Sequence, residues 1–476
     1  MATFANAVIT QEARTENGMK AIASTANTVV DLFYKIGASR GKDITKDFVA
    51  AFVENKELAL RVAQWARDVR GGAGERQIFR DILVYLEKTD TEAASLVMNK
   101  VPELGRWDDL LVFTDPVLKA QAFGLIKGAL NEGNGLCAKW MPRQGAVAAE
   151  LRKFMEMSPK TYRKTLVGLT NVVETKMCAR DWDNIDFSKL PSLASARYRT
   201  AFHKNSEKFK EYVAKLASGD KSVKVNAGAV YPYDVLKSVI MQGWGATALT
   251  QTDRDFIVAQ WEALPNFVGD ANILPMVDVS GSMSCLAGGP KSKSSVRCID
   301  VAVSLGLYLA DKNKGMFKDV FATFSSNPEL LNLKGNVIQK AEQMEKSNWE
   351  MGTNVIAAFK KVLDVAKKGN VSDQEMPRAL LVLSDMQFDQ CGSFDDSAMQ
   401  SIKRNFEAAG YTVPAVVFWN ISAHANVPVK FDQRGVALVS GFSPTIVTSV
   451  LAADLSNMTP EAIMLQTVMN PRYDLV

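Results

Sequence analysis

Side chains that carry oxygen atoms gather at the end of an apolar segment of the sequence. Asp278, Ser280 and Ser282 occupy alternate positions directly after an apolar run that begins at Ile273. At alternate positions of one turn the three side chains point the same way and offer a set of hard oxygen ligands. Such ligands suit Mg²⁺, which keeps several waters and uses only one or two carboxylates. The spacing therefore predicts a site for Mg²⁺ or Mn²⁺.

Two more oxygens are expected to join this site. Thr353 precedes a predicted helix, and Asp385 ends a second apolar run over residues 380–384. In a doubly wound sheet, ligands bind where the carboxyl ends of the strands meet. The candidate metal ligands are Asp278, Ser280, Ser282, Thr353 and Asp385. The alternative is a simple turn in which Ser280 and Ser282 cap the next helix.

The elements that must position these oxygens are short apolar runs that alternate with helices. The apolar runs cover residues 273–279, 320–324, 379–383, 414–419 and 435–439. Helical stretches lie between them, for example at residues 298–310, 355–366 and 399–409. This alternation predicts an α/β domain with a doubly wound, mostly parallel sheet over residues 269–476. Since roughly 200 residues can bury an adequate core, we expect this domain to fold alone.

The first part of the chain, residues 15–268, has a helical periodicity instead. Residues 45–70 place apolar side chains at spacings of three, four and seven, with an interruption near Asn55,. Similar stretches follow at residues 77–86, 115–130, 161–175, 197–216 and 253–264. The pattern predicts an all-α domain of stacked helix pairs, in the manner of a HEAT-like repeat.

Basic residues are concentrated in two segments of the helical domain. Residues 139–164 hold seven basic and two acidic side chains, and residues 197–224 hold eight basic and three acidic ones. Aromatic residues lie among them, and a cationic groove with stacking platforms is what single-stranded RNA needs. The candidate RNA-binding residues are Lys139, Arg143, Lys160, Arg163, Lys164, Arg197, Arg199 and Lys204. The alternative is two solvated helix faces whose aromatic residues turn into the core.

A glycine-rich turn offers a third candidate site for RNA. Arg67, Arg70 and Arg76 flank residues 71–74, which read Gly-Gly-Ala-Gly. Backbone N–H groups of such a turn could hold a phosphate while the arginines make bidentate contacts. The turn lacks the Gly-Lys-Ser/Thr of a nucleotide-binding loop. The alternative is a tight turn between helices, with Arg76 paired to Asp68.

The pattern D-x-S-x-S, followed by the threonine and the second aspartate, resembles the metal-ion-dependent adhesion site of von Willebrand A domains. Further segments resemble a two-domain family of plants, fungi and phages. They lie at residues 30–38, 66–76, 105–110, 139–143, 181–186, 384–389, 417–420 and 437–443. That family joins a TROVE-like helical domain to a C-terminal von Willebrand A domain and is related in architecture to the Ro autoantigen.

This resemblance implies a ribonucleoprotein role. The five oxygen-bearing residues would be the metal ligands, with an open coordination position that a carboxylate of a partner protein fills. The helical domain would bind small noncoding or misfolded RNA, as Ro proteins do. A metal site of this type binds ligands and ordinarily does no chemistry, so we expect a binding protein and not an enzyme.

The amino-acid composition argues against several classes of protein. The net charge is +4, so a basic surface must come from local clustering,. The five cysteines are scattered without a CxxC motif, which argues against a disulfide framework or a zinc knuckle,. No run approaches the ~18 apolar residues of a membrane helix. We expect a cytoplasmic protein without a membrane partner.

Two other functions stay open on the sequence alone. One is a protein–protein adhesion or assembly factor without RNA, such as a virion or host-takeover component. The other is a metal-dependent nuclease, which would need more carboxylates around the metal to activate water. With only two histidines in the chain, the sequence argues against a catalytic triad or a histidine-rich metal site,.

Overall fold

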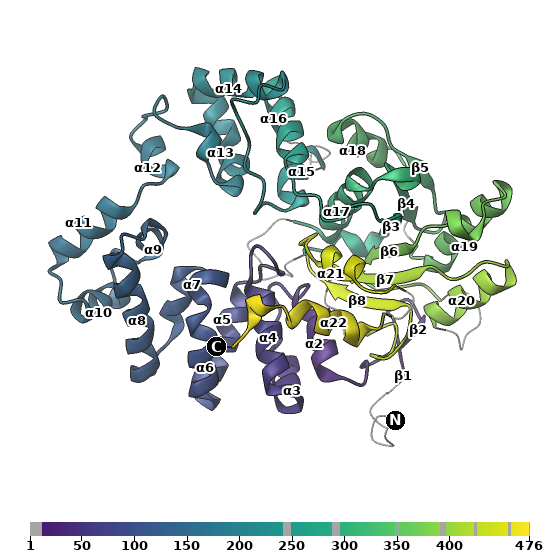
Figure 1. Ribbon diagram of the computed structural model, residues 1–476, viewed down its shortest axis with the longest axis horizontal. Coiled ribbons are helices and arrows are strands. Elements are labelled where there is room, and N and C mark those ends of the chain that lie inside the picture. Colours follow the sequence, from purple (N-terminus) through teal and green to yellow (C-terminus); the bar gives the residue numbers. More distant parts are fainter. Residues whose placement is uncertain are drawn as a thin grey trace.

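The computed structural model describes residues 12–240, 249–287, 296–347, 349, 352–390, 397–422, 426–455 and 458–475. The chain forms an arc of helices and an α/β domain, and both ends of the arc pack on the α/β domain (Figure 1). A short antiparallel hairpin, β1 (Glu12–Arg14) and β2 (Lys20–Ile22), precedes the arc.

The arc is built from short helices that pack on their neighbours in the chain, as α2 does on α3 and α5 on α6. Its helices are α2 (Thr28–Ile36), α3 (Thr45–Glu54), α4 (Lys56–Arg67), α5 (Gln77–Thr89), α6 (Thr91–Asn99), α7 (Val101–Leu104), η1 (Trp107–Val112), α8 (Pro116–Asn131), α9 (Gly135–Trp140), α10 (Ala146–Phe154), α11 (Pro159–Leu169), α12 (Val173–Cys178), η2 (Phe187–Lys189), α13 (Ser192–Asn205), α14 (Glu207–Ala217), α15 (Pro232–Ile240) and α16 (Gln251–Glu262). Asn55 ends α3, and its side chain accepts the Leu58 N–H at the start of α4. The interruption predicted near Asn55 is therefore a helix boundary.

The α/β domain contains a six-stranded sheet. Its strands are β3 (Ile273–Asp278), β4 (Val320–Phe324), β5 (Leu330–Asn332), β6 (Ala379–Ser384), β7 (Ala415–Asn420) and β8 (Val436–Ser440). They lie in the order β5-β4-β3-β6-β7-β8, and all neighbours are parallel except the pair β4 and β5. Every residue of β3, β6, β7 and β8 is buried, which explains why these strands read as continuous apolar runs,.

Helices cover both faces of this sheet. Val277 and Leu383 point into a core shared with α17 (Cys298–Lys312), α21 (Ile446–Ala452) and α22 (Pro460–Val468). Met276 and Val382 point into the opposite core, with α19 (Val355–Lys368) and α20 (Ala398–Ala408). The predicted helical part followed by a doubly wound, mostly parallel sheet is confirmed.

The start of the arc covers the carboxyl end of the sheet, and we call this contact the first junction. At the end of β8, the Ser440 hydroxyl donates to the Phe33 carbonyl at 3.0 Å. At the end of β7, the Asn420 amide donates to the Tyr34 carbonyl at 3.4 Å. The side chains of Met19 and Tyr34 are part of the core on the α19 face. Residues before α3 therefore complete the core of residues 269–476, so whether those residues fold alone stays a prediction that must account for the loss of these side chains.

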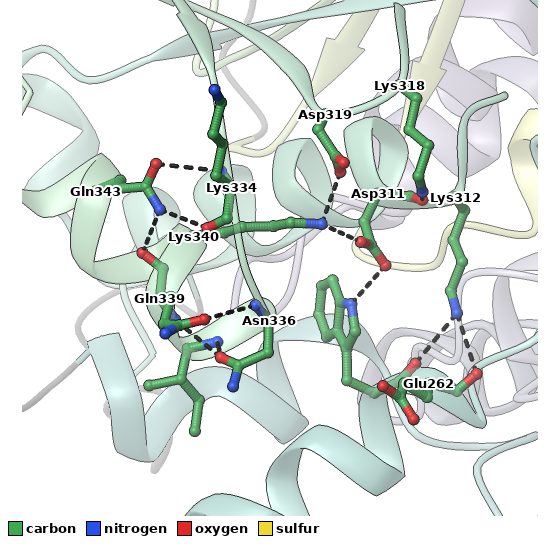
Figure 2. A network of polar contacts seen from close by, with 12 residues as sticks. Glu262, Asp311, Lys312, Lys318, Asp319, Lys334, Asn336, Gln339, Lys340 and Gln343 are labelled. Carbon is green, nitrogen blue, oxygen red and sulfur yellow. Dashed lines mark hydrogen bonds and ion pairs between the residues drawn. The ribbon is translucent and has the colours of Figure 1, made fainter. Parts of the chain in front are cut away.

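A second junction fastens the end of the arc to the α/β domain (Figure 2). Asp311 of α17 accepts a hydrogen bond from the indole of Trp261 on α16 at 2.9 Å. The Lys340 ammonium of α18 (Val337–Glu345) pairs with Asp311 at 2.5 Å and with Asp319 at 2.6 Å. Lys312 donates to the main-chain carbonyls of Trp261 and Glu262. With both junctions formed, the arc and the α/β domain make a closed circuit of elements.

Candidate metal centre and nucleic-acid interface

Two neighbouring strands bring the predicted carboxylates together. Asp278 ends β3, and Asp385 follows the last residue of β6, Ser384. The two strands are parallel, with Val277 opposite Leu383. The Ser384 hydroxyl donates to Asp278 Oδ2 at 2.5 Å, and both carboxylates are almost completely buried.

The electrostatics of this pair favour a cation. Burial and the negative charge of Asp385 raise the pKa of Asp278 to about 7. Two buried carboxylates of like charge are costly unless a positive charge lies beside them. A divalent cation would supply that charge, so the donor set fits Mg²⁺ or Mn²⁺. In the described part of the chain, no group of three or more His, Cys, Asp or Glu side chains is placed to hold a metal ion. Such a site must therefore use hydroxyl ligands as well.

The loop after β3 supplies two hydroxyls. The Ser280 N–H donates to Asp278 Oδ1 at 3.0 Å, which folds the loop back over the carboxylate. The hydroxyls of Ser280 and Ser282 lie 3.1 Å apart, with Ser280 buried and Ser282 exposed. Ser280 stands before the short helix η4 (Gly281–Ser284), but its side chain makes no capping hydrogen bond there. The geometry thus favours a shared oxygen cluster over the capping alternative.

The predicted ligand Thr353 contacts a residue that follows β6. Asp389 lies four residues after Asp385 and accepts the Thr353 N–H at 2.5 Å. In return, the Asp389 N–H donates to the Thr353 carbonyl at 2.9 Å. Thr353 itself is buried at the start of α19. Asp389 is a positioning residue, since it connects the threonine loop to the loop that carries Asp385.

Sequence reasoning missed the role of polar residues at the other strand ends. Ser384 contacts Asp278 directly, while Asn420 and Ser440 hold the carbonyls at the end of α2. A signal for them exists in the sequence, because each of these strands closes its apolar run with a polar residue. The carboxyl edge of the sheet therefore has two uses: β3 and β6 form the candidate metal centre, and β7 and β8 anchor the helical arc.

Most of the predicted RNA-binding residues lie on the surface of the arc. The exposed ones are Arg70, Arg76, Arg143, Lys160, Arg163, Lys164, Arg197 and Lys204. In the part of the chain that the structure describes, none of these eight forms an ion pair with a carboxylate. Lys139 is partly exposed and pairs with Glu174 at 3.4 Å. These eight exposed cationic side chains thus have no carboxylate at ion-pair distance among the described residues.

Two predicted RNA-binding residues belong to the core instead. Arg67 is 2% exposed and its Nε lies 2.7 Å from Asp109 Oδ2, which joins α4 to η1. Arg199 is 7% exposed and pairs with Asp253 at 2.9 Å, which joins α13 to α16. Buried, paired guanidinium groups cannot reach a phosphate, so these two assignments are corrected to structural ion pairs.

The glycine-rich turn caps a helix and does not cradle a phosphate. The N–H groups of residues 72–75 donate to the carbonyls of Trp65, Ala66 and Asp68 at the end of α4. At Gly72 a Cβ atom would lie 1.8 Å from the Trp65 carbonyl oxygen, so only glycine fits there. The predicted phosphate cradle is therefore wrong, because its donors are already used. The expected pair of Arg76 with Asp68 is absent too: Asp68 binds Arg472 of η7 (Pro471–Tyr473).

The aromatic residues divide between the core and the surface. Tyr162, Phe202 and Tyr212 are buried, so they cannot serve as stacking platforms. Trp140 is partly exposed, and the Arg106 guanidinium stacks 3.6 Å from its ring. Burial and the positive charges of Arg106 and Arg80 lower the pKa of the nearby Arg76. Arg80 and Arg106 are themselves paired with carboxylates, Arg80 with Asp108 and Asp109 and Arg106 with Asp108.

Family models cover both parts of the chain. Residues 15–103 and 142–271 match a model described as a domain of unknown function (DUF2828). Residues 272–470 match a second model, also described as a domain of unknown function (DUF7788). Among the described residues, every helix is too short or too polar to cross a lipid bilayer.

Individual proteins match along nearly the whole length. The chain is similar to the Ro (RSR) protein of Deinococcus radiodurans, whose crystal structure aligns with a TM-score of 0.49 and 14% identity, over 94% of this chain and 100% of that one. It is 30% identical to "Uncharacterized protein L728" of Acanthamoeba polyphaga mimivirus, over 96% of this chain and 88% of that protein. This chain belongs to the family of that mimivirus protein, through both its arc of helices and its α/β domain.

Proposed function

We propose that this protein is a Ro-like RNA-binding scaffold. Its TROVE-type, HEAT-like arc binds small or misfolded single-stranded RNA, and its von Willebrand A-like domain binds a partner protein through Mg²⁺. In this proposal the protein binds its ligands and catalyses no reaction.

The observation that carries the RNA part is the unpaired positive charge of the arc. Eight exposed arginines and lysines lack a carboxylate partner among the described residues, although the protein as a whole is only slightly basic. Phosphate groups would neutralise such charges and release counterions, which favours RNA binding. Beside them, the Arg106–Trp140 stack offers a partly exposed aromatic surface for a base,.

The metal part of the proposal rests on the oxygen cluster. Asp278, Ser280, Ser282, Thr353 and Asp385 would hold Mg²⁺ or Mn²⁺. The bound cation would supply an open coordination position for a carboxylate of the partner. Only two carboxylates lie in this set, fewer than a metal-dependent nuclease needs to activate water.

A second function, an assembly factor without RNA, is favoured by one observation. Three of the six aromatic residues in the basic segments are buried, which leaves Trp140, Phe154 and Tyr198 as possible stacking partners. Basic helix faces without stacking residues can equally bind an acidic protein surface.

Charge reversal on the arc tests RNA binding against this alternative. We expect binding of a fluorescent single-stranded RNA to weaken with salt, with a slope of about −0.7 per phosphate contact. Changing Lys160, Arg163 and Lys164 to glutamate should flatten that slope by about two units, because three phosphate contacts are lost.

The matched control is a triple variant with the same change in charge in the α/β domain. Lys360, Lys361 and Lys367 are exposed on α19, far along the chain from the basic segments. Changing them to glutamate alters the net charge equally and should leave the slope unchanged. Equal losses in both triple variants, or no salt dependence in the unmodified protein, would favour the assembly factor.

A further inference from the structure

Two cysteines that are 13 residues apart in the sequence meet beside the candidate metal centre. Cys285 follows η4, and Cys298 is the first residue of α17. Their sulfur atoms lie 3.3 Å apart. The Cys285 residue is exposed while Cys298 is buried, so a small oxidant can reach one thiol of the pair first. The scattered spacing of the cysteines gave no indication of this contact.

The backbone around the two thiols has the register of an antiparallel pair. Leu286 and Arg297 form an antiparallel bridge. The Cys298 N–H donates to the Cys285 carbonyl at 2.9 Å, and the Ala287 N–H donates to the Val296 carbonyl at 2.8 Å. These bonds place Cys285 directly opposite Cys298, at a hydrogen-bonded position of the pair.

That position has the spacing that a disulfide needs. Residues opposite each other at hydrogen-bonded positions have Cα atoms about 5.5 Å apart. Disulfides join residues whose Cα atoms are about 4.4–6.8 Å apart. The S–S bond therefore needs a shortening of the sulfur separation by about 1.2 Å, which side-chain rotation and a small shift of the Cys285 backbone can supply while the antiparallel pairing is kept,.

We propose that Cys285 and Cys298 form a dithiol site that a hydroperoxide oxidises to a disulfide. The exposed Cys285 sulfur, as a thiolate, attacks one peroxide oxygen, so that an S–O bond forms and the O–O bond breaks. Hydroxide leaves and takes up a proton to become water. The Cys298 sulfur then attacks the Cys285 sulfenic acid, the S–S bond forms, and water leaves with the Cys298 proton. Overall, two thiols lose two electrons, and the hydroperoxide is reduced to one water from each step when it is hydrogen peroxide, or to an alcohol and one water when it is an alkyl hydroperoxide.

The disulfide would act on the neighbouring metal loop, a consequence that rests on the proposed function. The Cys285 N–H donates to the carbonyl of Ser282 at 3.2 Å. Drawing Cys285 toward α17 pulls on this contact and moves a predicted metal ligand. Since changes to groups that orient metal ligands cost about tenfold in affinity, we expect the oxidised protein to bind Mn²⁺ about tenfold more weakly.

Peptide mapping of the full-length protein tests the dithiol site without reference to the metal. The reduced protein is treated with a small excess of hydrogen peroxide, blocked with a thiol-alkylating reagent, digested and analysed by mass spectrometry. We expect a cross-linked peptide joining Cys285 to Cys298, while the exposed Cys178 is alkylated. In Cys298→Ser, Cys285 should instead accumulate as a sulfenic acid that dimedone traps. Cys285→Ser, at an exposed position, should keep Cys298 reduced.

Each outcome decides one part of the inference. Free Cys298 after Cys285 has been oxidised further, or a disulfide from Cys285 to another cysteine, would overturn the dithiol site. Mn²⁺ titration of the reduced and oxidised forms tests the coupling, and equal affinities would refute it while the cross-link stands. If even the reduced protein binds no Mn²⁺, the proposed metal centre fails, but the peptide map still decides the dithiol site.

Discussion

The pair Asp278 and Asp385 determines how this site responds to protons and cations. Burial and Asp385 raise the pKa of Asp278 from 3.8 to about 7. Between about pH 4 and pH 7 the folded protein therefore binds more protons than the unfolded chain. Without metal, this carboxyl lowers the free energy of unfolding as the pH rises through that window. A bound divalent cation favours the ionised form of Asp278 and so removes this decrease in the free energy of unfolding.

Replacing Asp278 should separate the destabilising effect of its buried charge from the stabilising effect of a bound cation. We expect Mn²⁺ at a hundredfold excess over its Kd to stabilise the unmodified protein by about 2.7 kcal/mol at neutral pH. Asp278→Asn should abolish this gain, because the main charge of the site is lost. Without metal, the variant should melt at the same temperature as the unmodified protein or above it, since the buried charge is gone. Thermal melts with and without Mn²⁺ measure both effects.

The control lies in the same loop. Ser284→Ala removes an exposed hydroxyl of η4 that is outside the predicted ligand set, and it should keep the full response to Mn²⁺. A rise in melting temperature that persists in Asp278→Asn would show that Mn²⁺ binds elsewhere.

At single residues, the sequence predicted that two carboxylates lie at the ends of neighbouring strands, but it did not show which arginines are buried. Asp278 and Asp385 end apolar strands, and strand ends in a parallel sheet must meet at one edge. Arg67 and Arg199 look like their exposed neighbours, since their partners Asp109 and Asp253 lie 42 and 54 residues further along the chain. Local spacing contains no information about such distant pairs.

Among the helices, buried ion pairs at the first half of the arc hold successive elements together. Asp109 of η1 is completely buried and accepts from Arg67 of α4 and Arg80 of α5, at 2.7 Å in each case. One carboxylate thus fixes three elements at once.

We expect Asp109→Ala to destabilise the protein by about 3–5 kcal/mol, because it leaves Arg67 buried without a partner. Chemical denaturation followed by circular dichroism measures the change. Arg163→Ala, on the exposed face of α11, should change the free energy of unfolding by less than about 0.5 kcal/mol,. A loss below about 1 kcal/mol in Asp109→Ala would contradict the structural role given to this cluster.

At the level of elements, the sequence predicted the buried strands of the sheet but not the edge strand β5. Residues 273–278 and 379–384 are buried on both faces, so their apolar runs are continuous. The edge strand β5 has three residues and pairs antiparallel with β4. So short a segment has no recognisable alternation. The glycine turn at residues 71–74 was ambiguous for a related reason, because glycine suits both a phosphate cradle and a tight helix cap.

At the scale of the whole molecule, the two junctions make the halves depend on each other. At the first junction, the side chains of Met19 and Tyr34 pack in the core of the α/β domain. The second joins Trp261 to Asp311 and Lys340. The sequence located the change from helical to alternating periodicity. It could not show that residues before α3 pack against the sheet.

If the chain is divided between Val268 and Gly269, the two fragments should therefore stay together as a complex. We expect the two halves, expressed together, to co-purify through a tag on either half, because both junctions bury apolar side chains. Residues 269–476 expressed alone should melt at a lower temperature than the complex or aggregate, since their core lacks Tyr34. Trp261→Ala weakens the second junction and should lower the yield of the complex. Halves that elute separately would show that each domain is self-sufficient.

The first junction also sets the order in which the protein can be completed during its synthesis. The Ser440 hydroxyl and the Phe33 carbonyl that it binds are separated by 407 residues. At about 5–20 residues per second, a ribosome needs roughly 20 to 80 s to make the intervening chain. During that time α2 can pack on α3 and α4, but its contacts with β7 and β8 do not yet exist. The closed circuit of elements therefore forms last, after nearly the whole polypeptide has emerged.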